Sequence, residues 1–127
     1  METLYITHPI CRLHEMGRWH PECPARLDAI NDQLLASGML GFLDEKEAVK
    51  AGDATLLRVH TTEYLDYLRT HAPASGYFTL DPDTLMNPHT LEAARLAAGS
   101  GLLAVDAIMR GVAKTAFCAV RPPGHHA

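Results

Sequence analysis

Two kinds of hydrophobic pattern alternate along this chain: short continuous apolar runs, which are typical of buried strands, and apolar residues spaced three or four apart, which are typical of helices. Residues 4–7 (LYIT) predict a first strand, and residues 42–43 are a candidate second strand. Residues 115–120 (TAFCAV) are nearly all apolar and follow a helical pattern, so they predict a parallel strand covered on both faces. The alternation therefore predicts the α/β fold class, with helices on both sides of a sheet.

Polar and turn-forming residues separate these runs from the helical segments. Pro24 suits the first position of a helix, in which apolar residues recur at helical spacing until Gly38 offers a left-handed stop. A short helical turn is predicted at residues 56–59, and a further helix from residue 61 or 62. The polar residues 11–20 predict an exposed loop, and residues 72–86, which contain two prolines, predict a long loop.

The clearest helical pattern lies between residues 87 and 111. Asn87 is the predicted cap, Pro88 takes the first helical position, and Arg110 and Gly111 end the helix. Small residues are frequent in this segment, which allows the helix to approach a sheet closely. The predicted buried stripe consists of Leu91, Ala94, Ala98, Leu102, Val105 and Met109.

Composition narrows the class of protein without changing this picture. The chain has 127 residues, of which 47% are hydrophobic, enough for one domain with a modest core. A net charge of −4 and the lack of a Lys- or Arg-rich stretch argue against a nucleic-acid partner or an anionic membrane surface. No apolar run approaches the roughly 18 residues of a membrane span, and the amino terminus does not resemble a signal peptide. The three cysteines include no CxxC pair, so we expect reduced thiols in a cytoplasmic protein.

The strongest candidate for chemistry follows the last predicted strand. In open α/β sheets, ligands bind at the carboxyl ends of the strands, where this segment lies. Two prolines restrict the loop, a glycine allows close backbone approach, and two adjacent histidines can exchange protons near neutral pH. Such a stiff loop would aim the imidazoles with the accuracy that acid–base catalysis needs. The segment consists of Arg121, Pro122, Pro123, Gly124, His125 and His126.

Two other segments carry polar residues whose patterns have ordinary structural explanations. Glu22 lies just before a predicted helix, where a carboxylate is favoured, and Arg26 can pair with it at helical spacing. Asp81 and Asp83 suit an Asx-type turn ahead of the long helix. Neither segment indicates a function by itself.

Taken together and in this order, four segments resemble the histone deacetylase superfamily, which includes histone deacetylases, acetylpolyamine amidohydrolases and bacterial acetoin-utilisation proteins. The segments are residues 20–26 (HPECPAR), 59–64 (VHTTEY), 81–84 (DPDT) and 121–126 (RPPGHH). The last segment is the most specific of the four, and the first is the next most specific. Trp19 and the Glu-Cys-Pro sequence resemble the class II and bacterial deacetylase-like branch more than class I.

The resemblance implies the arginase-like, deacetylase-like three-layer fold with a mostly parallel central sheet. Residues 1–127 would form a single incomplete domain, the amino-terminal portion of the catalytic domain. The implied activity is zinc-dependent hydrolysis of N-acetyl-lysine in proteins or of acetylpolyamine amides. His126 would be the main general base and acid, and His125 would orient and assist the zinc-bound water.

The resemblance also implies the rim of a substrate channel. His20 and Pro21 would lie close to this rim, with Asp81 or Asp83 near its opposite side. The family's zinc ligands are an Asp-x-His pair and a further Asp, downstream of the tandem histidines. Because this sequence contains no Asp-x-His, we expect no metal ligand in it, no zinc bound to it and no activity of this chain alone.

An incomplete domain would also leave an unpaired strand edge and uncovered apolar faces. We therefore expect a homo-oligomer, in the form of an intertwined or swapped dimer. A second hypothesis is a non-catalytic oligomerising or regulatory module derived from such an enzyme. A third hypothesis keeps activity through a metal site built between chains from His125, His126 and an acidic residue.

Overall fold

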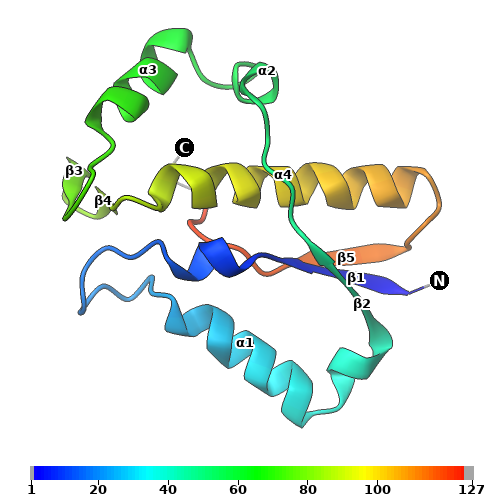
Figure 1. The fold of residues 1–127 in the computed structure, drawn as a ribbon. Coiled ribbons are helices and arrows are strands. Elements are labelled where there is room, and N and C mark those ends of the chain that lie inside the picture. The colour runs from blue at the N-terminus through cyan, green and yellow to red at the C-terminus, as the bar shows by residue number, and fades with distance from the viewer. Residues whose placement is uncertain (1, 125–127) are drawn as a thin grey trace.

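Three layers build the protein, because one helix packs on each face of a parallel three-stranded sheet (Figure 1). The structure is a computed structural model, and it describes residues 2–124. The sheet has the order β2-β1-β5, with β1 at Thr3–Thr7, β2 at Leu43–Glu47 and β5 at Thr115–Cys118. α1 (Ala25–Ala36) covers one face and α4 (Thr90–Met109) the other (Figure 1). The predicted α/β class is confirmed.

β1 is the centre of the core because it pairs with a strand on each side. Thr3 lies opposite Leu43 in β2 and opposite Thr115 in β5, and both pairings are parallel. The three middle residues of β1 are at most 2% exposed, so side chains on both faces of this strand are covered. The strand predicted at residues 4–7 is confirmed. Of the second prediction, residues 42–43, Leu43 begins β2, which extends to Glu47, whereas Phe42 belongs to the preceding 3-10 helix.

α1 follows the predicted helix closely. Pro24 is its N-cap rather than its first helical residue, and Gly38 has a left-handed φ of 77° as predicted. Leu27 is buried in the core, and Ile30 and Leu34 pack against the same cluster. After Gly38 the chain forms a short 3-10 helix (Met39–Phe42) that leads directly into β2.

The loop after β1 is less exposed than predicted. A 3-10 helix (Pro9–Arg12) follows the strand. Cys11 is 0% exposed and His14 is 1% exposed, so the prediction of an exposed loop is wrong at these positions. Trp19, further along the same loop, is 89% exposed. The polar composition of this segment concealed that two of its side chains are buried.

The segment predicted as one long loop at residues 72–86 contains a β-hairpin. β3 (Phe78–Asp81) pairs antiparallel with β4 (Thr84–Met86). Asp81 Oδ1 accepts a hydrogen bond of 2.8 Å from the backbone N–H of Asp83, which confirms the predicted Asx-type turn. The hairpin was missed because its strands are only four and three residues long and a proline lies between them.

α2 (Asp53–Leu56) and α3 (Thr62–His71) lie beyond α4, on the side away from the sheet (Figure 1). α3 begins where predicted, since Thr61 is its N-cap and accepts a hydrogen bond of 3.1 Å from the N–H of Tyr64. In the described part of the chain, no helix is both long enough and apolar enough to cross a membrane. The cytoplasmic location stays a prediction from the sequence.

The start of α4 differs from the prediction by two residues. Its first helical residue is Thr90, and its N-cap is His89. Asn87 Oδ1 accepts a hydrogen bond of 3.0 Å from the N–H of His89 and one of 3.1 Å from the Thr90 hydroxyl. Asn87 therefore stabilises the helix from the preceding turn, which also contains Pro88.

The buried face of α4 also differs from the predicted stripe. Leu102, Val105 and Met109 are 41%, 60% and 81% exposed, so these three positions are wrong. Apolar residues lie on more than one face of this helix, and close packing selects the face with the smaller side chains. The residues buried on α4 are Thr90, Ala93, Leu96, Gly99, Ser100 and Ala104.

β5 is a parallel strand, as predicted, but it is not covered on both faces. Exposure alternates along the strand, and Phe117 is 45% exposed. Within residues 2–124, no strand pairs with the edge of β5 that faces away from β1. The apolar run that suggested full burial therefore leaves one face and one edge of this strand uncovered.

One close approach on α4 yields a test of this packing. The chain after β2 crosses α4 at Gly99, where an added Cβ would lie 1.5 Å from the backbone oxygen of Val49 (Figure 1). We expect Gly99→Ala to lower the free energy of unfolding by about 3 kcal/mol, because a backbone segment must move. Urea denaturation followed by circular dichroism measures this change.

Gly101 on the same helix is the matched control. A Cβ there would meet nothing within 4 Å, so Gly101→Ala should raise the free energy of unfolding by about 0.5–1 kcal/mol. Equal effects of the two substitutions would contradict the crossing at Gly99.

Candidate functional site

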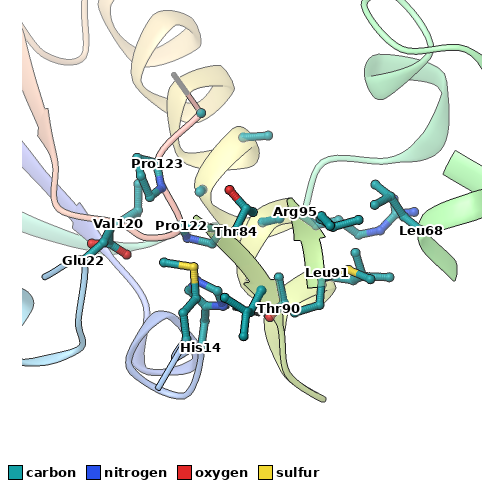
Figure 2. A pocket seen from close by; sticks show the side chains of 18 of the residues that line it. His14, Glu22, Leu68, Thr84, Thr90, Leu91, Arg95, Val120, Pro122 and Pro123 are labelled. Atoms are coloured by element: carbon teal, nitrogen blue, oxygen red, sulfur yellow. Dashed lines mark hydrogen bonds between the residues drawn. The ribbon is translucent and has the colours of Figure 1, made fainter. Parts of the chain in front are cut away.

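A cleft of about 860 Å³ lies at the carboxyl ends of β1 and β5, the edge at which open α/β sheets bind ligands. Its walls come from the loop after β1, the β3–β4 hairpin, α3, the first half of α4 and the segment after β5 (Figure 2). Leu91, Ala94 and Ala98, which were predicted to face the core, line this cleft. The small side chains of α4 therefore leave space for the cleft on this side of the helix.

The segment after β5 forms one wall of the cleft. Residues 120 and 122–124 line it (Figure 2), whereas Arg121 between them is 1% exposed and belongs to the core. His125 and His126, the predicted acid–base pair, lie outside the described residues. The stiff segment that precedes them therefore ends at the wall of the cleft.

The Arg121 guanidinium donates four hydrogen bonds inside the protein, from all three of its nitrogens. Nη1 donates to the backbone oxygen of Cys11, at 2.9 Å, and to that of His14. Nη2 donates to the backbone oxygen of Glu22 at 3.1 Å and forms an ion pair of 2.8 Å with Oε1 of its carboxylate. Nε donates to Oε2 of the same carboxylate at 3.2 Å. Arg121 therefore connects the last strand to the loop after β1 and to the residues that precede α1.

Glu22 has a second cationic partner on the protein surface. Arg26 donates to Oε2 of Glu22 at 2.8 Å, which confirms the pair predicted from helical spacing. The ion pair with Arg121 was not predicted, because the two residues are 99 positions apart and no spacing rule relates them. A chemical signal was available, since a charged residue directly after a buried strand needs a buried partner of opposite charge.

His14 is a buried histidine in the wall of the cleft that sequence reasoning missed. Its Nδ1 lies 2.8 Å from Oγ1 of Thr90, whose hydroxyl donates to Asn87 Oδ1 at 3.1 Å. The Thr90 hydroxyl must therefore accept from His14, so Nδ1 carries the proton and Nε2 is an acceptor. Nε2 has no hydrogen-bond partner among the described residues. Burial, and then the positive charge of Arg121, lower the pKa of His14 to about 4.

His20 and Asp83, two of the predicted rim residues, contact each other at the edge of the cleft. His20 Nδ1 accepts a hydrogen bond of 3.1 Å from the backbone N–H of Glu22, so Nε2 carries the proton of a neutral ring. This Nε2 donates to the backbone oxygen of Asp83 at 2.9 Å and to its Oδ1 at 3.1 Å. Pro21 also lines the cleft, whereas Asp81, which accepts a hydrogen bond from Asp83 in the hairpin turn, does not line it.

A second contact joins the loop after β1 to the hairpin segment. The Tyr77 hydroxyl donates to the Glu15 carboxylate and lies 2.6 Å from each of its oxygens. This hydrogen bond lowers the pKa of Glu15 and raises the pKa of Tyr77. Sequence reasoning missed both residues, and nothing in their spacing relates them. The loop and the hairpin are therefore joined at two points.

Metal-ligating side chains do not gather in the described part of the chain. Among residues 2–124, no group of three or more His, Cys, Asp or Glu side chains is arranged to hold a metal ion. The described residues therefore do not fit the zinc site that the resemblance implies. Cys11, Cys23 and Cys118 are free thiols.

Comparison with known proteins identifies the family. A model of the histone deacetylase domain matches residues 20–127. The histone deacetylase-like amidohydrolase of Pseudomonas aeruginosa is 37% identical over 107 residues, which cover 84% of this chain and 28% of that protein. A probable deacetylase of Archaeoglobus fulgidus is 35% identical over 131 residues, which cover 100% of this chain and 35% of that protein. Human polyamine deacetylase HDAC10 is 36% identical over 118 residues, covering 84% of this chain and 17% of that protein.

A solved structure agrees with these relatives. The crystal structure of the HDA15 HD domain superimposes with a TM-score of 0.91 at 34% identity, covering 99% of this chain and 36% of that one. The chain belongs to the histone deacetylase family, which confirms the family predicted from the four motifs. It spans between 17% and 35% of the length of the three relatives named above.

The lowered pKa of His14 predicts how stability depends on pH. In the unfolded chain this histidine binds a proton below pH about 6.5, whereas in the folded protein it does so only near pH 4. The unfolded state therefore gains protons first, and stability falls as the pH drops from about 6.5 to 4, by about 3 kcal/mol at most. His14→Gln keeps a hydrogen-bonding group but cannot titrate, so this variant should lose less stability over the same range.

Urea denaturation of both proteins at several pH values measures the difference. The carboxylates titrate in both proteins, so their contribution cancels in the comparison. Parallel curves for the wild type and His14→Gln would contradict a neutral, buried His14.

Proposed function

We propose that this chain supplies the acid–base segment and the channel rim of a zinc-dependent amidohydrolase that removes acyl groups from amines. The observation that carries the proposal is the cleft at the carboxyl ends of β1 and β5 (Figure 2). Its walls include residues 20–22 of the HPE segment and residues 122–124 of the RPPGHH segment. These are the two most specific motifs of the sequence, and Glu22 and Arg121 connect them directly.

The proton transfers fall to the tandem histidines. His126 acts first as general base toward the attacking water and then as general acid toward the leaving amine, and His125 orients and assists that water. An imidazole suits both steps because its ordinary pKa lies close to neutral pH. The position of both residues directly after segment 121–124, which ends at the cleft wall, supports these roles.

Zinc activates water and polarises the carbonyl in enzymes of this kind. Because residues 2–124 do not form a zinc site, we assign the metal ligands to a further part of the domain. Residues 1–127 then form one portion of a single catalytic domain. His20, Pro21 and Asp83 provide its rim, and Asp81 shapes the turn that positions Asp83.

The substrate we propose is an acetylated primary amine, either N-acetyl-lysine in a protein or an acetylpolyamine. The names of the relatives, a histone deacetylase-like amidohydrolase and a polyamine deacetylase, support this class. The cleft volume of about 860 Å³ is ordinary for a small-molecule site, and apolar walls suit an aliphatic stem. The apolar lining residues from three different elements include Leu65, Leu68, Leu80 and Leu91.

One observation favours a second candidate, a non-catalytic module that self-associates. The outer face of α4 exposes Val105 and Met109, which are 60% and 81% exposed. A second copy could cover this face as a homodimer.

The DNA beyond codon 127 distinguishes the two candidates. An open reading frame that leads to an Asp-x-His motif supports the hydrolase. A stop codon directly after Ala127, together with stable expression of the chain, favours the non-catalytic module.

The hydrolase proposal predicts a specific activity pattern. A protein with the complete domain should hydrolyse an acetyl-lysine reporter, and His126→Ala should lower kcat about a thousandfold, because proton transfer fails. The 127-residue chain alone should show no turnover above its own His126→Ala variant and no bound zinc by mass spectrometry. Turnover by the short chain with stoichiometric zinc would instead support a metal site built between chains.

The exposed face of α4 predicts the association state of the 127-residue chain. Size-exclusion chromatography with light scattering should show a dimer or larger species at micromolar concentration. Val105→Glu should shift this population toward monomer, since a charge on the apolar face must be desolvated in the dimer. Asp106→Glu, on the same helix turn, is the matched control and should leave the mass unchanged. A compact wild-type monomer would contradict self-association.

A further inference from the structure

The rim of the cleft and the acid–base segment are connected by an uninterrupted series of hydrogen bonds. Arg121 contacts the Glu22 carboxylate through Nε and Nη2, and its Nη2 also donates to the Glu22 backbone oxygen. The backbone N–H of Glu22 donates to His20 Nδ1, and His20 Nε2 donates to Asp83. The four residues come from three parts of the chain: the end of the last strand, the loop before α1 and the hairpin turn.

Each member of this series has a defined direction of donation. The backbone N–H of Glu22 can only donate, so His20 Nδ1 must accept and cannot carry a proton. The backbone oxygen of Asp83 can only accept, so His20 Nε2 must donate. The tautomer with the proton on Nε2 satisfies both contacts. The other tautomer would place its Nδ1–H against the N–H of Glu22, and its bare Nε2 against the backbone oxygen of Asp83. The ring is also shielded, since its side chain is 15% exposed.

The position of Glu22 is in turn set by Arg121. The Glu22 side chain is 13% exposed and the Arg121 side chain 2%, so their ion pair lies largely out of water. The planar guanidinium contacts both the carboxylate and the backbone oxygen of Glu22, which fixes the peptide groups around this residue. A lysine ammonium at the same place could not reach these acceptors simultaneously.

We propose that Arg121, Glu22 and His20 are positioning residues, which together set the place of Asp83 at the cleft rim relative to the segment that carries His125 and His126. His20 is therefore neither a general base nor a metal ligand in this arrangement, because both of its nitrogens are used. The contact between Tyr77 and Glu15 holds the other end of the hairpin segment to the same loop. The catalytic consequence rests on the proposed function, whereas the coupling from Arg121 to His20 does not.

The coupling can be tested on the 127-residue chain by nitrogen NMR of the histidine rings at pH 8. In the wild type, His20 should show the single tautomer with the proton on Nε2. Arg121→Lys should release Glu22 and change this signal to an average of the two tautomers. Arg26→Lys is the matched control, because Arg26 contacts the same carboxylate from the exposed side, and it should leave the His20 signal unchanged.

Glu22→Asp provides a second variant in case Arg121→Lys does not fold. It keeps the charge but shortens the side chain, so Arg121 cannot hold the carboxylate and the backbone oxygen together. The same mixed signal is expected. A wild-type His20 signal in either folded variant overturns the coupling, as does a wild-type protein without a single Nε2–H tautomer.

A protein with the complete domain tests the catalytic consequence. His20→Phe should raise KM for an acetyl-lysine reporter about tenfold and change kcat less than about twofold, because only the rim is displaced. Arg121→Lys should lower kcat by about tenfold or more, because the acid–base segment also moves. A wild-type KM in His20→Phe overturns the role of the rim. A wild-type protein with no turnover overturns the proposed function, and the NMR measurement then still decides the coupling.

Discussion

A guanidinium without access to water is the constraint on which the arrangement of this protein depends. A buried charge is tolerated only when it is paired and its donors are satisfied. Arg121 achieves this with three backbone oxygens and one carboxylate, all from residues between Cys11 and Glu22. To supply them, the loop after β1 must fold back over the end of β5. That requirement explains why Cys11 and His14 are buried in a segment of polar composition.

The sequence predicted the parts of the fold whose signals are local. The first strand, the left-handed Gly38, the start of α3 and the Asx turn of the hairpin each depend on residues that are neighbours in the chain. The errors concern contacts between distant segments. Whether Leu102 or Leu96 faces the core depends on what crosses α4, and here the chain after β2 crosses it at Gly99. Periodicity alone could not choose between two apolar faces of one helix.

The candidate site shows the same division. The motifs identified the segments that meet at the cleft, because each motif is a pattern of residue types within a few consecutive positions. The pairing of Glu22 with Arg121 spans 99 positions and that of Glu15 with Tyr77 spans 62, and no short-range pattern encodes either. His14 was missed for a related reason, since only Thr90 and Asn87, far along the chain, show that its ring is buried and neutral.

Arg121 and its partners are far apart in the sequence, and this separation affects how the protein folds during synthesis. During synthesis, the loop that contains Cys11 and Glu22 leaves the ribosome about 100 residues before Arg121, the cation that it surrounds in the folded protein. Contacts of such long range close large loops, and the entropy of that closure opposes their formation. Until these contacts form, the future rim of the cleft is an open loop, in which Glu22 has its surface partner Arg26 but not yet Arg121. Its final shape requires Arg121, and therefore the end of β5, to be in place.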